Sequence, residues 1–272
     1  MNRKVILFLI LTFSICWLTA LIMYLFGVEY GSITSLIILA VFYMLVPAAV
    51  AIIIQKFIYK EPLADYGFTL KNISIKHLLF TPVFYLAFVF LSTGIVFLFG
   101  NVLDIEGFGV LTFLQENINE NLAKIINGRA DITKLDIPAP EALFFLCIFG
   151  AIFSGISVNL LFTFGEEFGW RGLLLKETQA MGFWKSNFLI GFIWGIWHMP
   201  IILMGHNYPG YPVAGVGMMI LFCISLSFIQ AYLRLRSKTI LAPSAFHGML
   251  NAGAPVVIIC MINYNPLIGS IV

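Results

Sequence analysis

The chain contains little charge. Asp, Glu, Lys and Arg together make up only 10% of its 272 residues, while hydrophobic residues make up 61%. Soluble domains carry roughly 25% charged residues. A chain with so few charges cannot cover itself with polar surface, which excludes an ordinary soluble protein. The net charge of +2 by itself says nothing about nucleic acid, and we expect no nucleic-acid partner.

Disulfide and zinc patterns are also missing. The four cysteines, Cys16, Cys147, Cys223 and Cys260, lie far apart in apolar stretches. Disulfide frameworks and zinc sites are recognised by cysteines at characteristic spacings, which these four do not show. We therefore interpret them as small buried side chains. The sequence also has no internal repeat and no low-complexity segment.

Long apolar runs are abundant. A helix needs about 20 apolar residues to cross the ~30 Å hydrocarbon layer of a bilayer. We therefore predict an all-α, polytopic transmembrane helix bundle of about eight spans, forming one membrane-embedded domain over residues 1–272. The predicted spans are 5–26, 33–55, 77–99, 145–176, 186–204, 214–233, 239–252 and 254–271.

The only large loop is predicted at 101–140, outside the membrane. Apolar residues recur at helical spacing in its first half, so part of it is expected to form an amphipathic helix. This helix would lie on the outer membrane interface or cap the bundle. The apolar positions are Leu111, Leu114, Ile118, Leu122 and Ile125.

Basic residues predict the orientation, because cytoplasmic loops are enriched in Lys and Arg. With the N-terminus inside and eight spans, both termini are cytoplasmic. The membrane would be the plasma membrane in a prokaryote and the endoplasmic reticulum in a eukaryote. The inner set is Arg3, Lys4, Lys56, Lys60, Lys71, Lys76, Arg171, Lys176, Lys185, Arg234, Arg236 and Lys238, and the outer set is Lys124, Arg129 and Lys134.

Six polar residues interrupt the apolar runs. Ionisable groups inside a membrane cost several kcal/mol and usually mark a functional site. At about 1.5 Å per helical residue, Glu166, His198 and His247 lie about 15, 20 and 14 Å along the chain from basic residues predicted to lie at the inner face. These anchors are Lys176, Lys185 and Lys238, respectively. Three separate helices thus bring polar groups to a similar depth. The six are Glu166, Glu167, Arg171, His198, His247 and Asn251.

The two adjacent acids are predicted to have different roles. Glu166 and Glu167 point about 100° apart on a helix, so they cannot face the same spot. Glu167 precedes Arg171 by four residues, the favourable order for an ion pair. A paired carboxylate and guanidinium are tolerable in low dielectric, where either alone is not. We therefore assign Glu167 and Arg171 a supporting role, and Glu166 the role of catalytic base.

Two histidines and an amide complete the predicted site. His247 and Asn251 are four residues apart on one helical face, where their N–H groups could stabilise an oxyanion. His198 would face Glu166 and help to hold the attacking water. Two other histidines lie outside this depth: His77 starts a span at the inner interface, and His206 sits in an outer loop.

At these residues the chain resembles the CPBP family of intramembrane proteases. That family includes type II CAAX prenyl endopeptidases and bacteriocin-processing or self-immunity proteins. Its motifs are Glu-Glu-x-x-x-Arg, Phe-x-x-x-His and His-x-x-x-Asn or Asp, and their order and spacing fit over roughly residues 145–255. They are carried by Glu166, Glu167 and Arg171, by His198 with Trp194 in place of phenylalanine, and by His247 and Asn251.

The resemblance implies an eight-helix bundle with a water-filled cavity open toward the cytoplasm. It also implies endopeptidase activity on membrane-associated peptides or proteins, including prenylated CAAX-type substrates. Glu166 and His198 would activate water, and His247 and Asn251 would stabilise the oxyanion.

Zinc is the alternative to metal-free catalysis. Catalytic zinc takes three protein ligands and keeps an open position, and Glu166, His198 and His247 could supply them. No second carboxylate would then be left as a base, because Glu167 is assigned to Arg171. We therefore favour hydrolysis without a metal or other cofactor.

Non-enzymatic functions are the remaining alternatives. The polar residues would also suit an immunity protein that binds a toxic peptide, or a proton-coupled carrier. Carriers often contain paired halves with discontinuous helices, and the sequence shows no such repeat.

Overall fold

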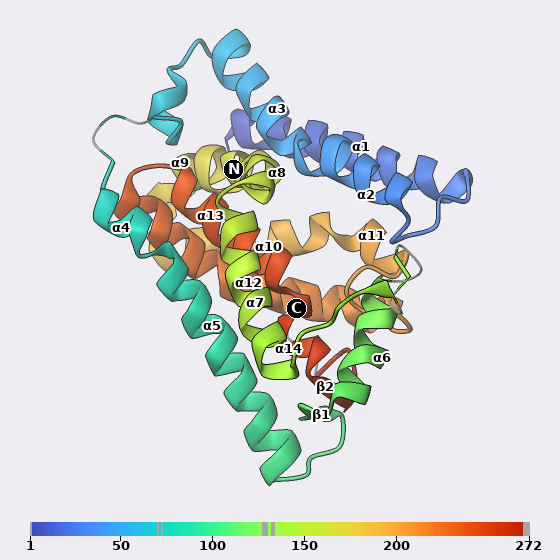
Figure 1. Ribbon diagram of the computed structural model, residues 1–272. Coiled ribbons are helices and arrows are strands. Elements are labelled where there is room, and N and C mark those ends of the chain that lie inside the picture. Colours follow the sequence, from blue (N-terminus) through green and yellow to red (C-terminus); the bar gives the residue numbers. More distant parts are fainter. Residues whose placement is uncertain (1, 70, 72, 127–129, 132–133, 269–272) are drawn as a thin grey trace.

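The computed structural model describes residues 2–69, 71, 73–126, 130–131 and 134–268 (Figure 1). Over these residues the protein is an all-α bundle apart from one two-stranded ribbon. The longer helices are α1 (Arg3–Leu25), α5 (Thr81–Val96), α6 (Gln115–Ile126), α7 (Pro140–Gly155), α8 (Val158–Glu167), α10 (Phe183–Trp197), α12 (Pro212–Ser237) and α13 (Leu241–Gly253). The shorter helices are α2 (Ile33–Leu39), α3 (Val46–Ile52), α4 (Ile75–Leu79), α9 (Leu175–Thr178), α11 (Met199–Leu203) and α14 (Pro255–Ile259), and the strands are β1 (Phe108–Leu111) and β2 (Met261–Tyr264).

The chain is a polytopic membrane protein, with fewer continuous spans than the sequence predicts. Among the described residues, five helices are long and apolar enough to cross a membrane, and one bent pair makes a sixth. The predicted 186–204 span is divided into α10 and α11 at His198, close to Pro200. Proline has no N–H and disrupts the preceding helical turn, which explains the division.

The predicted 145–176 span is also not a single straight helix. Its two parts, Pro140–Gly155 and Val158–Met181, are bent by 58° relative to each other. The break lies at Ile156 and Ser157, where the Ser157 hydroxyl donates to the carbonyl of Phe153 at 2.6 Å. The chain then stays helical through Glu166 and continues as a π-helix over Phe168–Leu174.

The last predicted span, 254–271, does not form one transmembrane helix over its described part, residues 254–268. Its residues 269–271 lie outside the described residues. Prolines 255 and 266 flank a segment too short for a transmembrane helix, and β2 pairs there in antiparallel fashion with β1. The Asn265 side chain donates to the Tyr211 hydroxyl at 3.2 Å. The described C-terminal part therefore meets the connections predicted as outer. The cytoplasmic side of the C-terminus stays a prediction.

The outer connection contains the predicted amphipathic helix, which is α6. It packs against α14, and the buried Asn121 amide donates to the carbonyls of Ile259 and Met261 at 3.0 and 2.9 Å. The helix therefore caps this end of the bundle. Arg129, which was counted in the outer set, lies outside the described residues.

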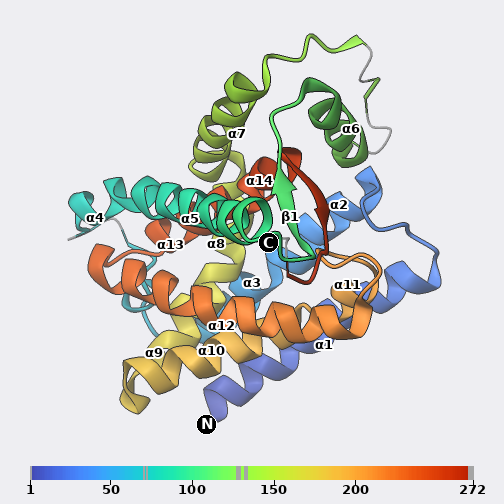
Figure 2. The same ribbon diagram turned by 90° about the horizontal axis from the view of Figure 1, so that it is seen from below.

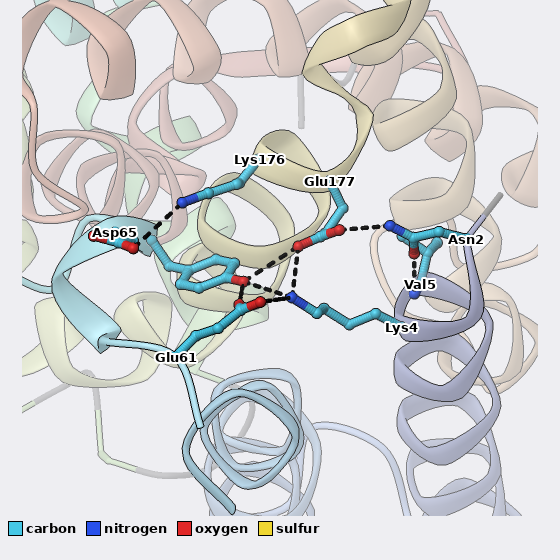
Figure 3. A network of polar contacts seen from close by, with 8 residues as sticks. Asn2, Lys4, Val5, Glu61, Asp65, Lys176 and Glu177 are labelled. Atoms are coloured by element: carbon cyan, nitrogen blue, oxygen red, sulfur yellow. Dashed lines mark hydrogen bonds and ion pairs between the residues drawn. The ribbon is translucent and has the colours of Figure 1, made fainter. Parts of the chain in front are cut away.

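Charged residues gather at the opposite end of the bundle (Figure 3). The Lys4 ammonium, which is only 6% exposed, lies 2.6 Å from Glu61 and 2.9 Å from Glu177. Lys4 also donates to the Tyr66 hydroxyl at 2.8 Å. These contacts fix the start of α1 to the connection after α3 and to α9. The predicted inner end thus contains a partly buried ionic cluster.

Helices α10 and α12 run alongside each other (Figure 2). They approach closely at Gly191, where an added Cβ would lie 2.5 Å from the Ile224 Cα and 2.8 Å from the Cys223 carbonyl oxygen. Small residues at such crossings let membrane helices pack backbone to backbone. This contact positions the end of α10, which carries His198.

Replacing Gly191 by alanine is expected to destabilise the protein by about 1–3 kcal/mol, because both helix backbones must separate. Thermal unfolding in detergent measures the effect. Gly150→Ala is the matched control, since nothing lies within 4 Å of a Cβ at Gly150. Equal melting temperatures for the two variants would show that this crossing tolerates a methyl group.

Candidate active site

Glu166 lies in the last turn of α8 and is only 2% exposed. Its Oε2 accepts a hydrogen bond from the Trp194 indole N–H at 2.9 Å. Oε1 has no hydrogen-bond partner among the described residues. One carboxylate oxygen is therefore fixed, and the other is available to a reactant.

Glu167 is fully buried and makes two contacts through one oxygen. Its Oε1 accepts from the Arg171 guanidinium at 3.0 Å, which is the ion pair predicted from the spacing. The same oxygen lies 2.9 Å from the His247 Nδ1, a contact that the sequence did not suggest. Because a carboxylate only accepts, His247 must donate its Nδ1–H. Glu167 thus orients His247, and the imidazole Nε2 remains for other partners.

His198 follows directly after α10, where the helix ends. Its Nδ1 lies 2.8 Å from the carbonyl oxygen of Trp194. A carbonyl only accepts, so Nδ1 carries the proton, and in a neutral ring Nε2 is free to accept. The structure therefore selects the His198 tautomer whose Nε2 can accept a hydrogen bond from water.

Trp194 contacts Arg171 and both histidines of the site as well as Glu166. Its ring lies 5.2 Å from the His247 ring and 5.6 Å from the His198 ring, centroid to centroid. The Arg171 guanidinium carbon lies 4.5 Å from its centroid, a cation–π contact. The sequence marked this position only as an aromatic residue. Its indole N–H gives it a second function, holding Glu166.

Trp194→Phe is therefore expected to lower the cleavage rate by about 10- to 100-fold. Phenylalanine keeps the aromatic packing but loses one hydrogen bond to a carboxylate, which is worth about 1.5–3 kcal/mol. Steady-state kinetics on purified protein measure the change. Trp184→Phe is the control, because Trp184 is 72% exposed and lies away from the site. A rate unchanged by Trp194→Phe would rule out positioning by the indole.

A cavity of about 390 Å³ joins the predicted site residues. Glu166, His198, His247 and Asn251 all line it, as the depth count predicted. Asn251 is exposed to the cavity and makes no hydrogen bond within the described part of the chain. Four groups from α8, α10 and α13 thus share one space, while their chemical roles remain predictions.

The cavity also extends away from the inner ionic cluster. Its lining includes Tyr30, His206 and Asn207, which belong to connections at the outer end. The cytoplasmic opening that the resemblance implies stays a prediction. The cavity lining also includes His206, which the depth count had excluded from the site. The count assumed that loop residues stay outside, whereas this loop turns back toward His198.

The alternative zinc set is not assembled. Within the described ranges, no group of three or more His, Cys, Asp and Glu side chains is placed to hold a metal ion. Glu166, His198 and His247 line the same cavity without converging as ligands. The choice between zinc and metal-free catalysis stays a prediction, and the mechanism proposed below contains no metal step.

An embedded carboxylate, two imidazoles and an amide around one cavity define a candidate hydrolase site in a polytopic membrane protein. Residues 139–253, which include all six predicted site residues, match the family described as type II CAAX prenyl endopeptidase Rce1-like. Over this region the chain is similar to the CPBP family.

One curated relative supports the same assignment. The protein named CAAX prenyl protease 2 from Methanococcus maripaludis is 27% identical over 93 residues, which cover 32% of this chain and 34% of that protein. The match thus spans about a third of the length of the curated relative.

Proposed function

We propose that the protein is an intramembrane endopeptidase that hydrolyses peptide bonds of membrane-associated substrates. The observation that carries this proposal is the half-engaged Glu166 carboxylate on a cavity that also contains His198, His247 and Asn251. The family match favours a protease over a carrier or a peptide-binding immunity protein.

In the proposed mechanism, a water molecule lies between Glu166 and His198. Glu166 Oε1 takes a proton from it, and His198 Nε2 accepts its second hydrogen bond. The water oxygen attacks the carbonyl carbon of the scissile bond. The proton on Glu166 then passes to the amide nitrogen as the C–N bond breaks. The products are a carboxylic acid and an amine.

The developing oxyanion would be held by His247 and Asn251. A protonated His247, whose charge Glu167 balances through Nδ1, presents Nε2–H to the oxyanion. The Asn251 amide supplies a second donor from one helical turn further on. Donors fixed in place before the reaction stabilise the transition state without reorganisation.

The proposed substrate is a peptide or protein segment at the membrane. A prenylated C-terminus is the substrate type in the relative's name, and the apolar part of the cavity wall suits an apolar group of this kind. The wall includes Leu36, Leu39, Phe88, Val89, Phe222 and Ile258. From the distribution of Lys and Arg, we propose that the N-terminus is cytoplasmic.

The test is cleavage of a fluorophore–quencher CAAX peptide by purified protein in detergent. Farnesylated and unmodified forms of the peptide are compared, each with and without a strong chelator. We expect cleavage that is insensitive to the chelator. Absence of cleavage of both peptides would contradict the protease assignment. Loss of cleavage on chelation, with recovery on adding zinc, would contradict metal-free hydrolysis.

A further inference from the structure

His206 reaches the cavity from the connection between α11 and α12. Its Nδ1 is hydrogen-bonded to the hydroxyl of Tyr30, which lies between α1 and α2. Two connections that are far apart in sequence thus meet at this ring. Both residues line the same cavity as Glu166 and His198.

The tautomer of His206 follows from the chemistry of this contact. Burial lowers the pKa of His206 to about 4 and raises the pKa of Tyr30 to about 12, so both are uncharged at neutral pH. A phenol O–H is a better donor than an imidazole N–H, and an imidazole nitrogen is a better acceptor than a phenol oxygen. Tyr30 therefore donates to Nδ1, and the proton of the neutral His206 ring lies on Nε2.

The remaining donor lies at a defined distance from the catalytic groups. The His206 ring is nearly parallel to the His198 ring, with 9° between their planes and 6.3 Å between their centroids. In an extended peptide, carbonyls that face the same side are two residues apart, or about 6.6 Å. In the proposed mechanism His198 holds the water that attacks the scissile carbonyl, so His206 lies about one two-residue repeat of an extended peptide away from that water site.

Charge indicates which ligand suits this donor. No Lys or Arg lines the cavity within the described residues. A phosphate or another anion would be left without a cationic partner. An uncharged acceptor, such as a peptide carbonyl, matches an uncharged imidazole N–H.

We propose that His206 is a substrate-binding residue, whose Nε2–H binds a peptide carbonyl two residues from the scissile bond, with Tyr30 holding the ring. The proposal rests on the proposed function, since it takes the substrate to be an extended peptide. Under this proposal, the connections that carry Tyr30 and His206 take part in substrate recognition, although neither residue belongs to the three sequence motifs.

The test measures binding apart from chemistry. The Kd of the CAAX peptide is measured on protein carrying Glu166→Gln, alone and combined with His206→Phe, His206→Gln or Tyr30→Phe. We expect about 3- to 10-fold weaker binding with His206→Phe, a smaller loss with Tyr30→Phe, and partial rescue by His206→Gln, whose amide can donate. His77→Phe is the control, because His77 does not line the cavity. In otherwise unaltered protein, His206→Phe should raise KM and leave kcat within about twofold.

Modified peptides identify the acceptor. One carbonyl, two residues before or two residues after the scissile residue, is reduced to a methylene group. Compared with the unmodified peptide, one of these two peptides should bind 3- to 10-fold more weakly to the Glu166→Gln protein. To the Glu166→Gln protein that also carries His206→Phe, it should bind as tightly as the unmodified peptide does. If wild-type protein cleaves the peptide but His206→Phe changes neither Kd nor KM, this proposal fails alone. If wild-type protein neither binds nor cleaves the peptide, both proposals fail.

Discussion

Replacing Glu166 by glutamine is expected to lower kcat by about 10²- to 10⁴-fold, the usual contribution of a general base. Glutamine has the same shape and keeps a carbonyl oxygen that can accept from the Trp194 indole, so the local structure should survive. An amide cannot take a proton from water at neutral pH. Cleavage kinetics measure the loss, and size-exclusion chromatography with thermal unfolding checks the fold.

The matched control for this prediction is Glu141→Gln. Glu141 lies in the first turn of α7, is exposed, and does not line the cavity. The Glu141→Gln protein should cleave the peptide at the wild-type rate. If folded Glu166→Gln protein also cleaves at that rate, another group must activate the water, and the assignment of the base is wrong.

Local spacing predicted much of the site. The pair of Glu167 and Arg171 follows from a separation of four residues, which a helix places on one face. The shared depth of Glu166, His198 and His247 follows from counting along helices from basic anchors. Both arguments require only that each segment be helical near the residue concerned. The 58° bend does not affect either argument, because it lies at Ile156 and Ser157, before Glu166 and Glu167 in the chain.

Contacts between distant segments were not predictable in this way. The bond of Glu167 to His247 joins residues 80 positions apart, and that of Trp194 to Glu166 joins residues 28 apart. These depend on how helices rotate and cross, which composition does not specify. His206 was missed because depth counting treats a loop as lying outside the bundle. Its loop instead turns inward and bonds to Tyr30.

The number of spans was overestimated for a related reason. Hydropathy reports how apolar a segment is, and not whether it crosses a membrane as one helix. Residues 254–264 are apolar because they pack against α5, α6 and α7 and pair with β1. An apolar segment here therefore forms the short helix α14 and the strand β2, and not a transmembrane helix.

Arg171→Met is expected to destabilise the protein by about 3–5 kcal/mol, the second large effect. The side chains of Arg171 and Glu167 are both 0% exposed. Removing Arg171 leaves the buried Glu167 carboxylate with the His247 Nδ1–H as its remaining partner, and loss of one member of a buried ion pair is strongly destabilising. The control is Lys124→Met on α6, which breaks the pair with Glu120. That pair has the same spacing of four residues but side chains 67% and 63% exposed. Breaking it should cost about 0.3–0.5 kcal/mol. Unfolding of both variants in detergent gives the comparison.

A double variant separates stability from catalysis at this pair. Combining Arg171→Met with Glu167→Gln removes both charges, so it should recover a substantial part of the lost stability. Activity should not recover with it, because glutamine no longer balances a protonated His247 beside the oxyanion. If the double variant regains stability and wild-type kcat together, then Glu167 serves the fold alone. If the double variant regains stability but cleaves slowly, Glu167 stabilises the fold through its ion pair with Arg171 and supports catalysis through its contact with His247.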